Sequence, residues 1–279
     1  MFLLPLLSGA IAIFSPFFGI MAMMLFCAKA LGPAIVSPQR AISAFFVVPL
    51  LVMLFDGSSP TTPLIVLDAI LGVGAVAYVF LIVLRKTQYL NYAFLAAALV
   101  IMLYSIVRTM LFGSVLDMIY QEGIQTMQAQ LPGFLDGQYM ELSARLWKYL
   151  QPAFWGVAQI SALLVSFVIF HKTIKIPLKA SEMKFPVFYN FLILAVLPLY
   201  FVPSGRATFV NAMILLCTIP LIQGFFASLN GLARVFESKI IRGIIMFFLL
   251  IYAFVPLTLY GFADSWMSHS NKPRGGKTA

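Results

Sequence analysis

The chain has 279 residues, of which 62% are hydrophobic and 10% charged, and its formal net charge is +9. A water-soluble protein of this composition would have too little polar sequence to cover its surface, which argues against a soluble globular fold. The basic residues do not cluster with aromatic residues on one solvated face, as a nucleic-acid groove requires, so no nucleic-acid partner is expected.

Apolar runs separated by polar gaps follow one another along the chain. Each run from Thr62 onward has about 18 to 25 residues, enough for a helix rising about 1.5 Å per residue to cross a hydrocarbon core about 30 Å thick. We therefore predict an all-α fold, a polytopic transmembrane helical bundle of about eight spans. Residues 1–269 form a single integral membrane domain, and residues 270–279 form a polar, disordered tail. The runs are Phe2–Leu31, Ala41–Phe55, Thr62–Leu84, Tyr89–Gly113, Pro152–Phe170, Phe185–Val202, Ala207–Leu229 and Ile240–Ala263.

The first run is less regular than the others. Ser15 and Pro16 interrupt it, and Gly32, Pro33 and Pro38 follow it. Proline removes a helical hydrogen bond and crowds the preceding turn, so this run is either one kinked span or two short helices that dip into the membrane. One span gives eight crossings, whereas two halves that both cross give nine.

The longest gap, residues 114–151, has its own helical pattern on both sides of Pro132-Gly133. We predict two amphipathic helices lying against the outer membrane surface, either as a structural lid with interfacial aromatic side chains or as a lid that gates a ligand. The apolar positions are Leu116, Ile119, Tyr120, Ile124 and Met127, then Tyr139, Leu142, Leu146, Trp147 and Leu150.

The charges in the gaps predict the orientation of the spans. Eleven Lys and Arg residues lie in alternate gaps, and only Arg145, Lys148 and Arg206 lie in the others. Short basic loops stay on the cytoplasmic side during insertion, so the first kind of gap is cytoplasmic and the lipid bilayer is the protein's principal partner. The eleven are Lys29, Arg40, Arg85, Lys86, Lys172, Lys175, Lys179, Lys184, Arg234, Lys239 and Arg242.

The C-terminal tail is the one exception to this charge rule. Strict alternation places it outside, yet residues 270–279 contain Lys272, Arg274 and Lys277 and no acid. Either the tail is too far from the last helix to matter, or one run is re-entrant and the terminus is cytoplasmic. The side of the C-terminus stays open on sequence grounds.

Two charged residues fall well inside predicted spans. Asp68 lies six residues into the Thr62 run, and Arg108 lies five residues before Gly113. A short connection makes these two helices antiparallel neighbours, so both charges reach a similar height in the outer half and can form an ion pair. With Tyr104 one turn before Arg108, the group either faces a polar cavity that contacts solute, or serves only to neutralise an arginine that snorkels to the headgroups.

Other polar residues fall at a similar predicted depth. Trp155 and Gln159 lie one turn apart near the start of the Pro152 run, and Arg206 and Asn211 open the Ala207 run. One interpretation is that these residues line one outward-facing pocket together with the charged pair. The other is that the Gln159 and Asn211 amides only form hydrogen bonds between packed helices. Further along, Gly224, Ala227, Ser228 and Gly231 provide small residues at four-residue spacing, which indicates close helix packing.

Motifs that carry chemistry are missing. The only histidines, His171 and His269, lie at membrane edges, and no zinc-protease, serine-hydrolase or P-loop motif is present. Cys27 and Cys217 both lie inside apolar runs, where a thiol is usually a small hydrophobe. We therefore expect no catalytic residues, no metal and no cofactor, and we do not expect an enzyme.

The gap from His171 to Lys184 contains four lysines. It is expected to be a cytoplasmic loop that lies near anionic headgroups or docks a protein partner. The candidate docking residues are Lys172, Lys175, Lys179 and Lys184.

From Leu146 onward the order of features resembles the YybS-like family of predicted bacterial membrane proteins. The features are Leu150-Gln151-Pro152, His171-Lys172 through Ile176-Pro177, Phe185-Pro186, Ile222-Gln223-Gly224 and Gly261-Phe262-Ala263-Asp264-Ser265-Trp266. This family looks distantly similar to the S components of energy-coupling-factor transporters. The resemblance implies a multi-pass protein of the bacterial inner membrane with an outward-facing solute pocket and a cytoplasmic partner. Family members tend to have basic residues just after the last motif, where this chain has Ser268-His269-Ser270.

Two functions follow from these expectations. The first is S-component-like binding or transport of a small-molecule solute in an outer-half polar pocket. The alternative is a non-catalytic membrane scaffold or assembly factor for envelope or cell-shape machinery, supported by the basic loop and the small-residue helix face.

Overall fold

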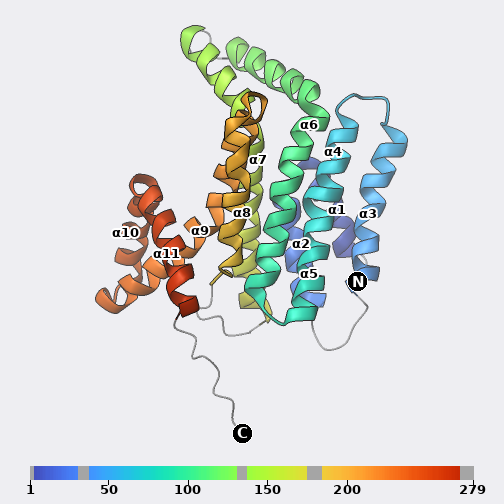
Figure 1. Cartoon of the computed structure of the whole chain (residues 1–279). Coiled ribbons are helices and arrows are strands. Elements are labelled where there is room, and N and C mark those ends of the chain that lie inside the picture. The colour runs from blue at the N-terminus through green and yellow to red at the C-terminus, as the bar shows by residue number, and fades with distance from the viewer. Residues whose placement is uncertain (1–2, 31–37, 131–136, 175–183, 271–279) are drawn as a thin grey trace. The chain divides into compact units, whose positions relative to one another are not determined.

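A computed structural model describes residues 3–30, 38–130, 137–174 and 184–270 (Figure 1). The regular elements of these ranges are all helices, with no β-strand among them, so the predicted all-α class is confirmed for the described part of the chain. The chain divides into two compact units, Met1–Ile176 (unit 1) and Pro177–Ala279 (unit 2), which are described separately. A single membrane domain over residues 1–269 stays a prediction.

Unit 1 contains the first seven α-helices and one π-helical segment. They are α1 (Leu3–Phe14), α2 (Pro16–Ala30), α3 (Pro38–Phe55), α4 (Thr62–Ala69), the π-helix η1 (Ile70–Ala75), α5 (Val76–Thr87), α6 (Leu90–Gln130) and α7 (Gly137–Ile174). Unit 2 contains α8 (Phe188–Val196), the 3₁₀ segments η3 (Leu197–Phe201) and η4 (Pro203–Gly205), α9 (Arg206–Val235), α10 (Lys239–Tyr252) and α11 (Phe254–Ser270).

Among the described residues, four helices are long and apolar enough to cross a membrane, and a fifth span is counted if the bent pair α10–α11 is one span. The four are the continuous helix Thr62–Thr87, which comprises α4, η1 and α5, together with α6, α7 and α9. The predicted number of about eight spans is not confirmed, because the remaining apolar runs are shorter helices or are broken. The Phe185 run, for example, is α8 followed by the 3₁₀ segment η3.

The first apolar run is two helices that fold back on each other. Ser15 separates α1 from α2, and Pro16 occupies the first position of α2, where a missing backbone N–H costs nothing. A Cβ added to Gly19 would lie 2.7 Å from the Cα of Ala12. Residues seven apart in a straight helix are separated by about 10 Å along the axis, so this contact requires a sharp reversal of the chain. Of the two readings left open by the sequence, the structure has two short helices.

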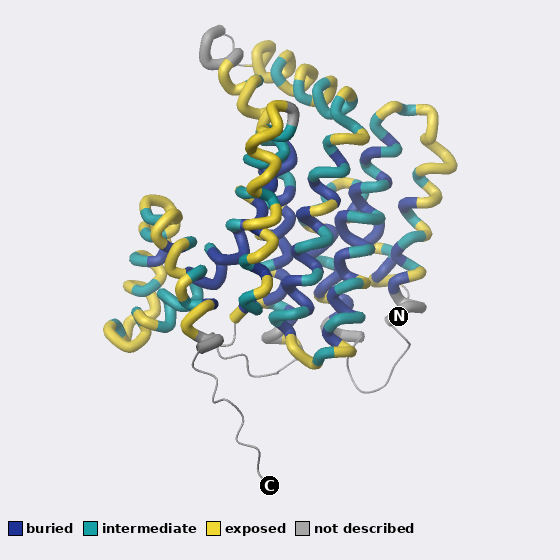
Figure 2. The backbone as a smooth tube through the Cα atoms, viewed as in Figure 1, coloured by how far each residue is buried: buried dark blue, intermediate teal, exposed yellow. Residues whose placement is uncertain are grey.

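The gap 114–151 is helical on both sides of residues 131–136, which lie outside the described residues. Its helices are not separate: the first continues α6 beyond a kink at Phe112 (φ −121°, ψ 20°), and the second is the start of α7 (Figure 1). The two extensions pack together, with Tyr120 stacked on Trp147 at a ring separation of 5.5 Å and Lys148 Nζ 2.6 Å from Asp117 Oδ2. Both extensions are largely exposed (Figure 2), and Ile119, Met127 and Leu142 are among their exposed apolar residues. That they lie as amphipathic helices against the outer membrane surface stays a prediction.

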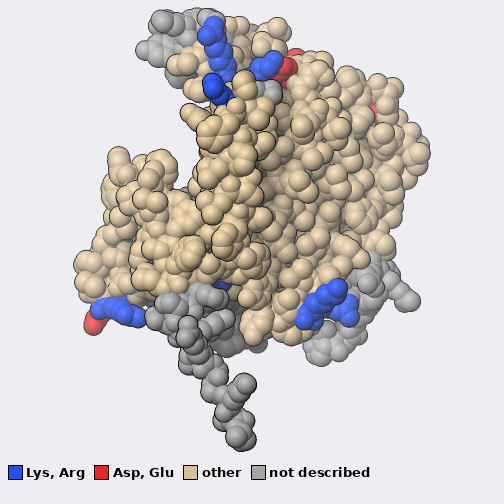
Figure 3. Space-filling view, viewed as in Figure 1, with Lys and Arg blue, Asp and Glu red and all other residues tan. Residues whose placement is uncertain are grey.

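The buried part of unit 1 lies where α2, α5, α6 and α7 pack against one another (Figure 2). Edge-to-face pairs join α7 to its neighbours, Phe94 with Phe167 and Phe80 with Phe170. Lipid removes the hydrophobic driving force between helices, so such packing and polar contacts decide how the helices associate. On the visible surface, charged side chains gather near helix ends and leave a broad uncharged band between them (Figure 3).

In unit 2, α9 and α11 cross with backbone in contact. A Cβ at Gly224 would collide with the carbonyl oxygen of Leu257, and one at Gly261 would collide with that of Pro220. The close approach predicted for Gly224 is therefore observed, whereas Gly231 has no such neighbour within 4 Å.

Replacing Gly261 with alanine should destabilise the protein, because the new methyl group collides with backbone that has no flexible side chain to move. We expect a loss of about 1–3 kcal/mol or more, against no loss for Gly231→Ala, which faces open space and gains helix propensity. Thermal unfolding of both purified variants in one detergent measures this difference. Equal midpoints would contradict the crossing.

Candidate functional site

The candidate site in unit 1 is built on three helices. Asp68 lies near the end of α4, Tyr104 and Arg108 lie one turn apart on α6, and Trp155 lies on α7. The α4 helix passes directly into the π-helical segment η1. Such segments are rare, shift the register of side chains within a helix and occur frequently at functional sites.

Asp68 and Arg108 form a bidentate ion pair. Arg108 Nε donates to Asp68 Oδ1 at 2.7 Å, and Arg108 Nη2 donates to Oδ2 at 2.9 Å. The two residues are only 5% and 7% exposed. This confirms the predicted pairing. Both roles considered for the pair, contact with a solute in a polar cavity and neutralisation of an arginine that snorkels to the headgroups, stay predictions.

Two aromatic side chains complete the surroundings of the pair. The Tyr104 hydroxyl donates to Asp68 Oδ1 at 2.8 Å, so this carboxylate accepts three hydrogen bonds. The Arg108 guanidinium lies over the Trp155 ring, 5.1 Å from its centroid, and Tyr104 meets the same ring edge-to-face at 5.4 Å. A desolvated cation over an aromatic face is stabilised by about 2 kcal/mol.

Gly72 explains how α7 reaches this cluster. It lies in η1, and a Cβ at this position would be 3.1 Å from Trp155 Cη2 and 3.7 Å from Tyr104 Cε1. The missing side chain makes room for the indole ring between the two helices. Gly72 was not among the predicted site residues, because the sequence gives no register for the π-helical segment.

Three glutamine and tryptophan side chains follow one face of α7 at four-residue spacing: Gln151, Trp155 and Gln159. Gln151 Oε1 accepts a short hydrogen bond from the Thr109 hydroxyl of α6, a contact that sequence reasoning missed although the spacing on α7 was visible. Gln159, by contrast, is 4% exposed and its Oε1 has no hydrogen-bond partner. Arg108 Nη1 is likewise buried without a partner.

Arg206 and Asn211, the other predicted pocket residues, lie at the start of α9 in unit 2. The Arg206 guanidinium lies 5.9 Å from the Tyr200 ring centroid, and Asn211 Nδ2 donates to the Ala207 carbonyl of its own helix at 2.8 Å. These contacts are within unit 2, so a common pocket with Asp68 and Arg108 stays a prediction.

The four lysines proposed to dock a partner are described only in small part. Lys184 is exposed, whereas Lys175 and Lys179 and the side chain of Lys172 lie outside the described residues. Within the described ranges, no group of three or more His, Cys, Asp or Glu side chains is arranged to hold a metal ion.

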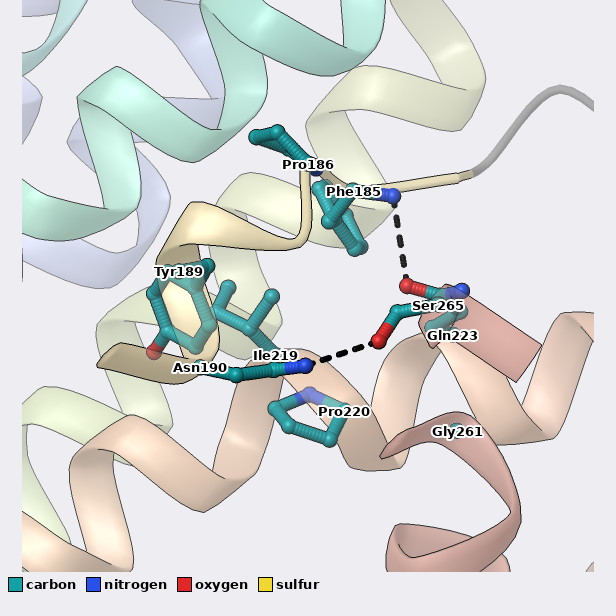
Figure 4. Close-up of a pocket in the computed structure, with 9 residues that line it drawn as sticks. All are labelled: Phe185, Pro186, Tyr189, Asn190, Ile219, Pro220, Gln223, Gly261 and Ser265. Carbon is teal, nitrogen blue, oxygen red and sulfur yellow. Dashed lines mark hydrogen bonds between the residues drawn. The ribbon is translucent and has the colours of Figure 1, made fainter. Parts of the chain in front are cut away.

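Unit 2 has a separate polar network. Gln223 Nε2 donates to Asp264 Oδ2 at 2.7 Å, and Gln223 Oε1 accepts from the Phe185 backbone N–H at 3.2 Å. Asn190 Nδ2 donates to Ser265 Oγ at 2.9 Å beside a small cavity lined also by Pro220 and Gly261 (Figure 4). The space inside is about 10 Å³, room for about one water, so this cavity does not suit a solute.

Comparison of the chain with protein-family models, with curated proteins and with solved structures gives no match. The resemblance to the YybS-like family therefore stays a prediction. The class that the structure itself defines is a helical protein whose described part has four or five candidate membrane spans, by length and composition, and a buried Asp-Arg-Tyr-Trp cluster.

Asp68→Asn should be strongly destabilising, because it leaves the Arg108 charge buried without its counter-ion. We expect a loss of about 3–5 kcal/mol, and partial recovery when Arg108→Leu is combined with Asp68→Leu. The exposed pair Asp117–Lys148 is the matched control, and Asp117→Asn should cost at most about 1 kcal/mol. Unfolding of the three variants in the same lipid–detergent mixture tests this, and similar losses for Asp68→Asn and Asp117→Asn would contradict the argument.

Proposed function

We propose that this is a multi-pass protein of the bacterial inner membrane that binds a small polar solute in unit 1, for transport in the manner of an S component. The observation that supports it is two unpartnered buried atoms in unit 1: Nη1 of Arg108, which lies over Trp155, and Oε1 of Gln159, which lies one turn after Trp155 on α7. Leaving a buried polar group unsatisfied costs about 1–3 kcal/mol, and more for a charged group. Proteins retain such groups where a ligand or ordered water completes them.

The two unpartnered atoms need opposite kinds of hydrogen-bond partner. Arg108 Nη1 is a donor and needs an acceptor, whereas Gln159 Oε1 is an acceptor and needs a donor. A solute with both, such as a hydroxyl, amide or lactam group, would satisfy each of them. Because Arg108 lies on α6 and Gln159 lies on α7, and these two helices pack against each other, we place one solute group across them.

Charge balance favours a neutral solute over an anionic one. Asp68 already neutralises Arg108 through two of its nitrogens. A second anion would leave a net negative charge in a low-dielectric interior, at a penalty of several kcal/mol. The role of Asp68 and Tyr104 in this proposal is to hold the guanidinium in place so that Nη1 points away from the ion pair.

Entry of a solute requires movement, because neither atom is accessible in this state. The π-helical segment η1 lies against Trp155 through Gly72. A π-helical turn is held by fewer well-aligned hydrogen bonds than an α-helical one, which makes η1 the natural place for α4 and Trp155 to shift.

Gln159→Leu separates this function from a purely structural role. Removing an unsatisfied acceptor should leave the ligand-free protein as stable as before or more stable, while the affinity for a co-purifying solute falls about tenfold, equivalent to about 1.4 kcal/mol. Native mass spectrometry of the purified protein identifies the solute, and titration of the variants with it measures the loss.

Gln151→Leu is the matched control on the same face of α7, since its oxygen already accepts from Thr109. This control should lose stability and keep its affinity. Arg108→Lys keeps the positive charge opposite Asp68 but removes Nη1, so this variant should bind the solute less tightly. Absence of any bound solute, or equal affinities for the two glutamine variants, would refute the proposal.

A further inference from the structure

Helix α10 in unit 2 exposes almost its whole surface. Of its 14 residues only Met246 is buried. Large apolar side chains are exposed along one broad side of the helix, among them Ile240, Ile241, Ile244, Phe247, Phe248 and Ile251. Apolar surface of this extent is not left in water, so α10 needs an apolar cover that the described part of unit 2 does not provide.

The length and bend of α10 exclude a simple span. Fourteen residues rise about 21 Å, which is less than the hydrocarbon thickness of about 30 Å. The chain then turns by 102° into α11. The ring of Pro256 would clash with the carbonyl of Tyr252, four residues earlier, and Ala253 accordingly leaves the helical conformation (φ −128°, ψ 30°).

After this turn, α11 runs back toward the side of unit 2 from which α10 starts (Figure 1). Basic residues mark that side: Arg234 at the end of α9, then Lys239 and Arg242 in the first turn of α10. In a continuous span the basic tail residues Lys272, Arg274 and Lys277 would be on the opposite side of the membrane. A returning helix places all of these cations on one side, as the retention of basic loops requires.

We propose that α10 and α11 form a re-entrant hairpin, which enters the bilayer from the cytoplasmic side and leaves on that side. The acyl chains of the cytoplasmic leaflet cover the apolar surface of α10, and the C-terminus is cytoplasmic. The inference uses only contacts within unit 2 and the charges at its helix ends, so it does not depend on solute binding in unit 1.

Single cysteines labelled with a membrane-impermeant maleimide, in intact cells and in inverted vesicles, test the topology. Val202→Cys and Glu237→Cys report the two ends of α9, and Thr278→Cys reports the tail. The unsubstituted chain gives the background labelling. We expect Val202→Cys to react in intact cells, and both Glu237→Cys and Thr278→Cys to react only in inverted vesicles. Reaction of Thr278→Cys in intact cells would overturn the proposal and make α10–α11 a broken span.

Labelling at the bend and on α10 tests the depth of the hairpin and the nature of its cover. Tyr252 is 79% exposed in unit 2, so Tyr252→Cys would react freely if the bend lay in water. We expect it to be protected on both sides of the membrane. In protein reconstituted alone into lipid nanodiscs, Phe247→Cys should resist the impermeant maleimide and react with a lipid-soluble one. Reaction of either cysteine with the impermeant reagent would overturn the membrane assignment.

Discussion

The cost of placing a charge in hydrocarbon governs the arrangement of unit 1. A lone Asp or Arg at the centre of a spanning helix costs about 2.5–3.5 kcal/mol on insertion scales, so neither Asp68 nor Arg108 is tolerable alone. Their bidentate contact fixes the rotation of α4 and α6 about their own axes, because a turn of one residue on either helix would carry one charge out of reach. Once α4 and α6 are fixed, Tyr104 reaches the same carboxylate and Trp155 of α7 covers the guanidinium. The ion pair thus fixes α4 against α6, and the Trp155 contact together with the Thr109–Gln151 hydrogen bond fixes α7 against α6.

The contact between Asp68 and Arg108 was predictable from the depth of each residue in its predicted span. Asp68 and Arg108 lie at similar distances from the ends of two runs joined by a short connection, and antiparallel helices of this kind bring such positions together. Tyr104 followed from its one-turn spacing to Arg108. Trp155 was predicted as a site residue but not as a partner of Arg108, since the Pro152 run follows a gap of 38 residues and its register against α6 has no sequence signal. The π-helical segment and the unpartnered atoms of Arg108 and Gln159 were not predictable either, because hydropathy patterns carry no information on local hydrogen bonding or on side-chain rotamers.

The number of spans was harder to predict because proline has two outcomes in this chain. Helices α7 and α9 pass through Pro152 and Pro220 without a break, whereas the chain reverses near Pro16 and bends before Pro256. The difference depends on the carbonyl that proline leaves without its usual donor. In α9 this is the Leu216 carbonyl, four residues before Pro220, and the Tyr189 hydroxyl of α8 donates to it at 2.7 Å. A neighbouring helix has replaced the missing bond, which is how proline persists inside membrane helices. The sequence of α9 alone does not contain this donor, so run length overestimates the number of spans wherever a substitute donor is lacking.

The two units differ in how far their buried polar side chains find hydrogen-bond partners. In unit 2, glutamine, asparagine and serine side chains satisfy one another around a space for about one water, and α9 and α11 touch through glycines. Such a network stabilises a fixed arrangement and leaves nothing for a ligand to add. In unit 1, Asp68 accepts hydrogen bonds from only part of the Arg108 guanidinium, and Nη1 is left without an acceptor. Gln159 Oε1 has no donor in the described part of the chain. Unit 2 also has one buried nitrogen without a partner, Arg242 Nε, although Nη2 of the same side chain donates to the Glu237 carbonyl. A solute that supplies an acceptor to Arg108 Nη1 and a donor to Gln159 Oε1 would gain the missing hydrogen bonds on binding, which supports the proposal that unit 1 binds a ligand.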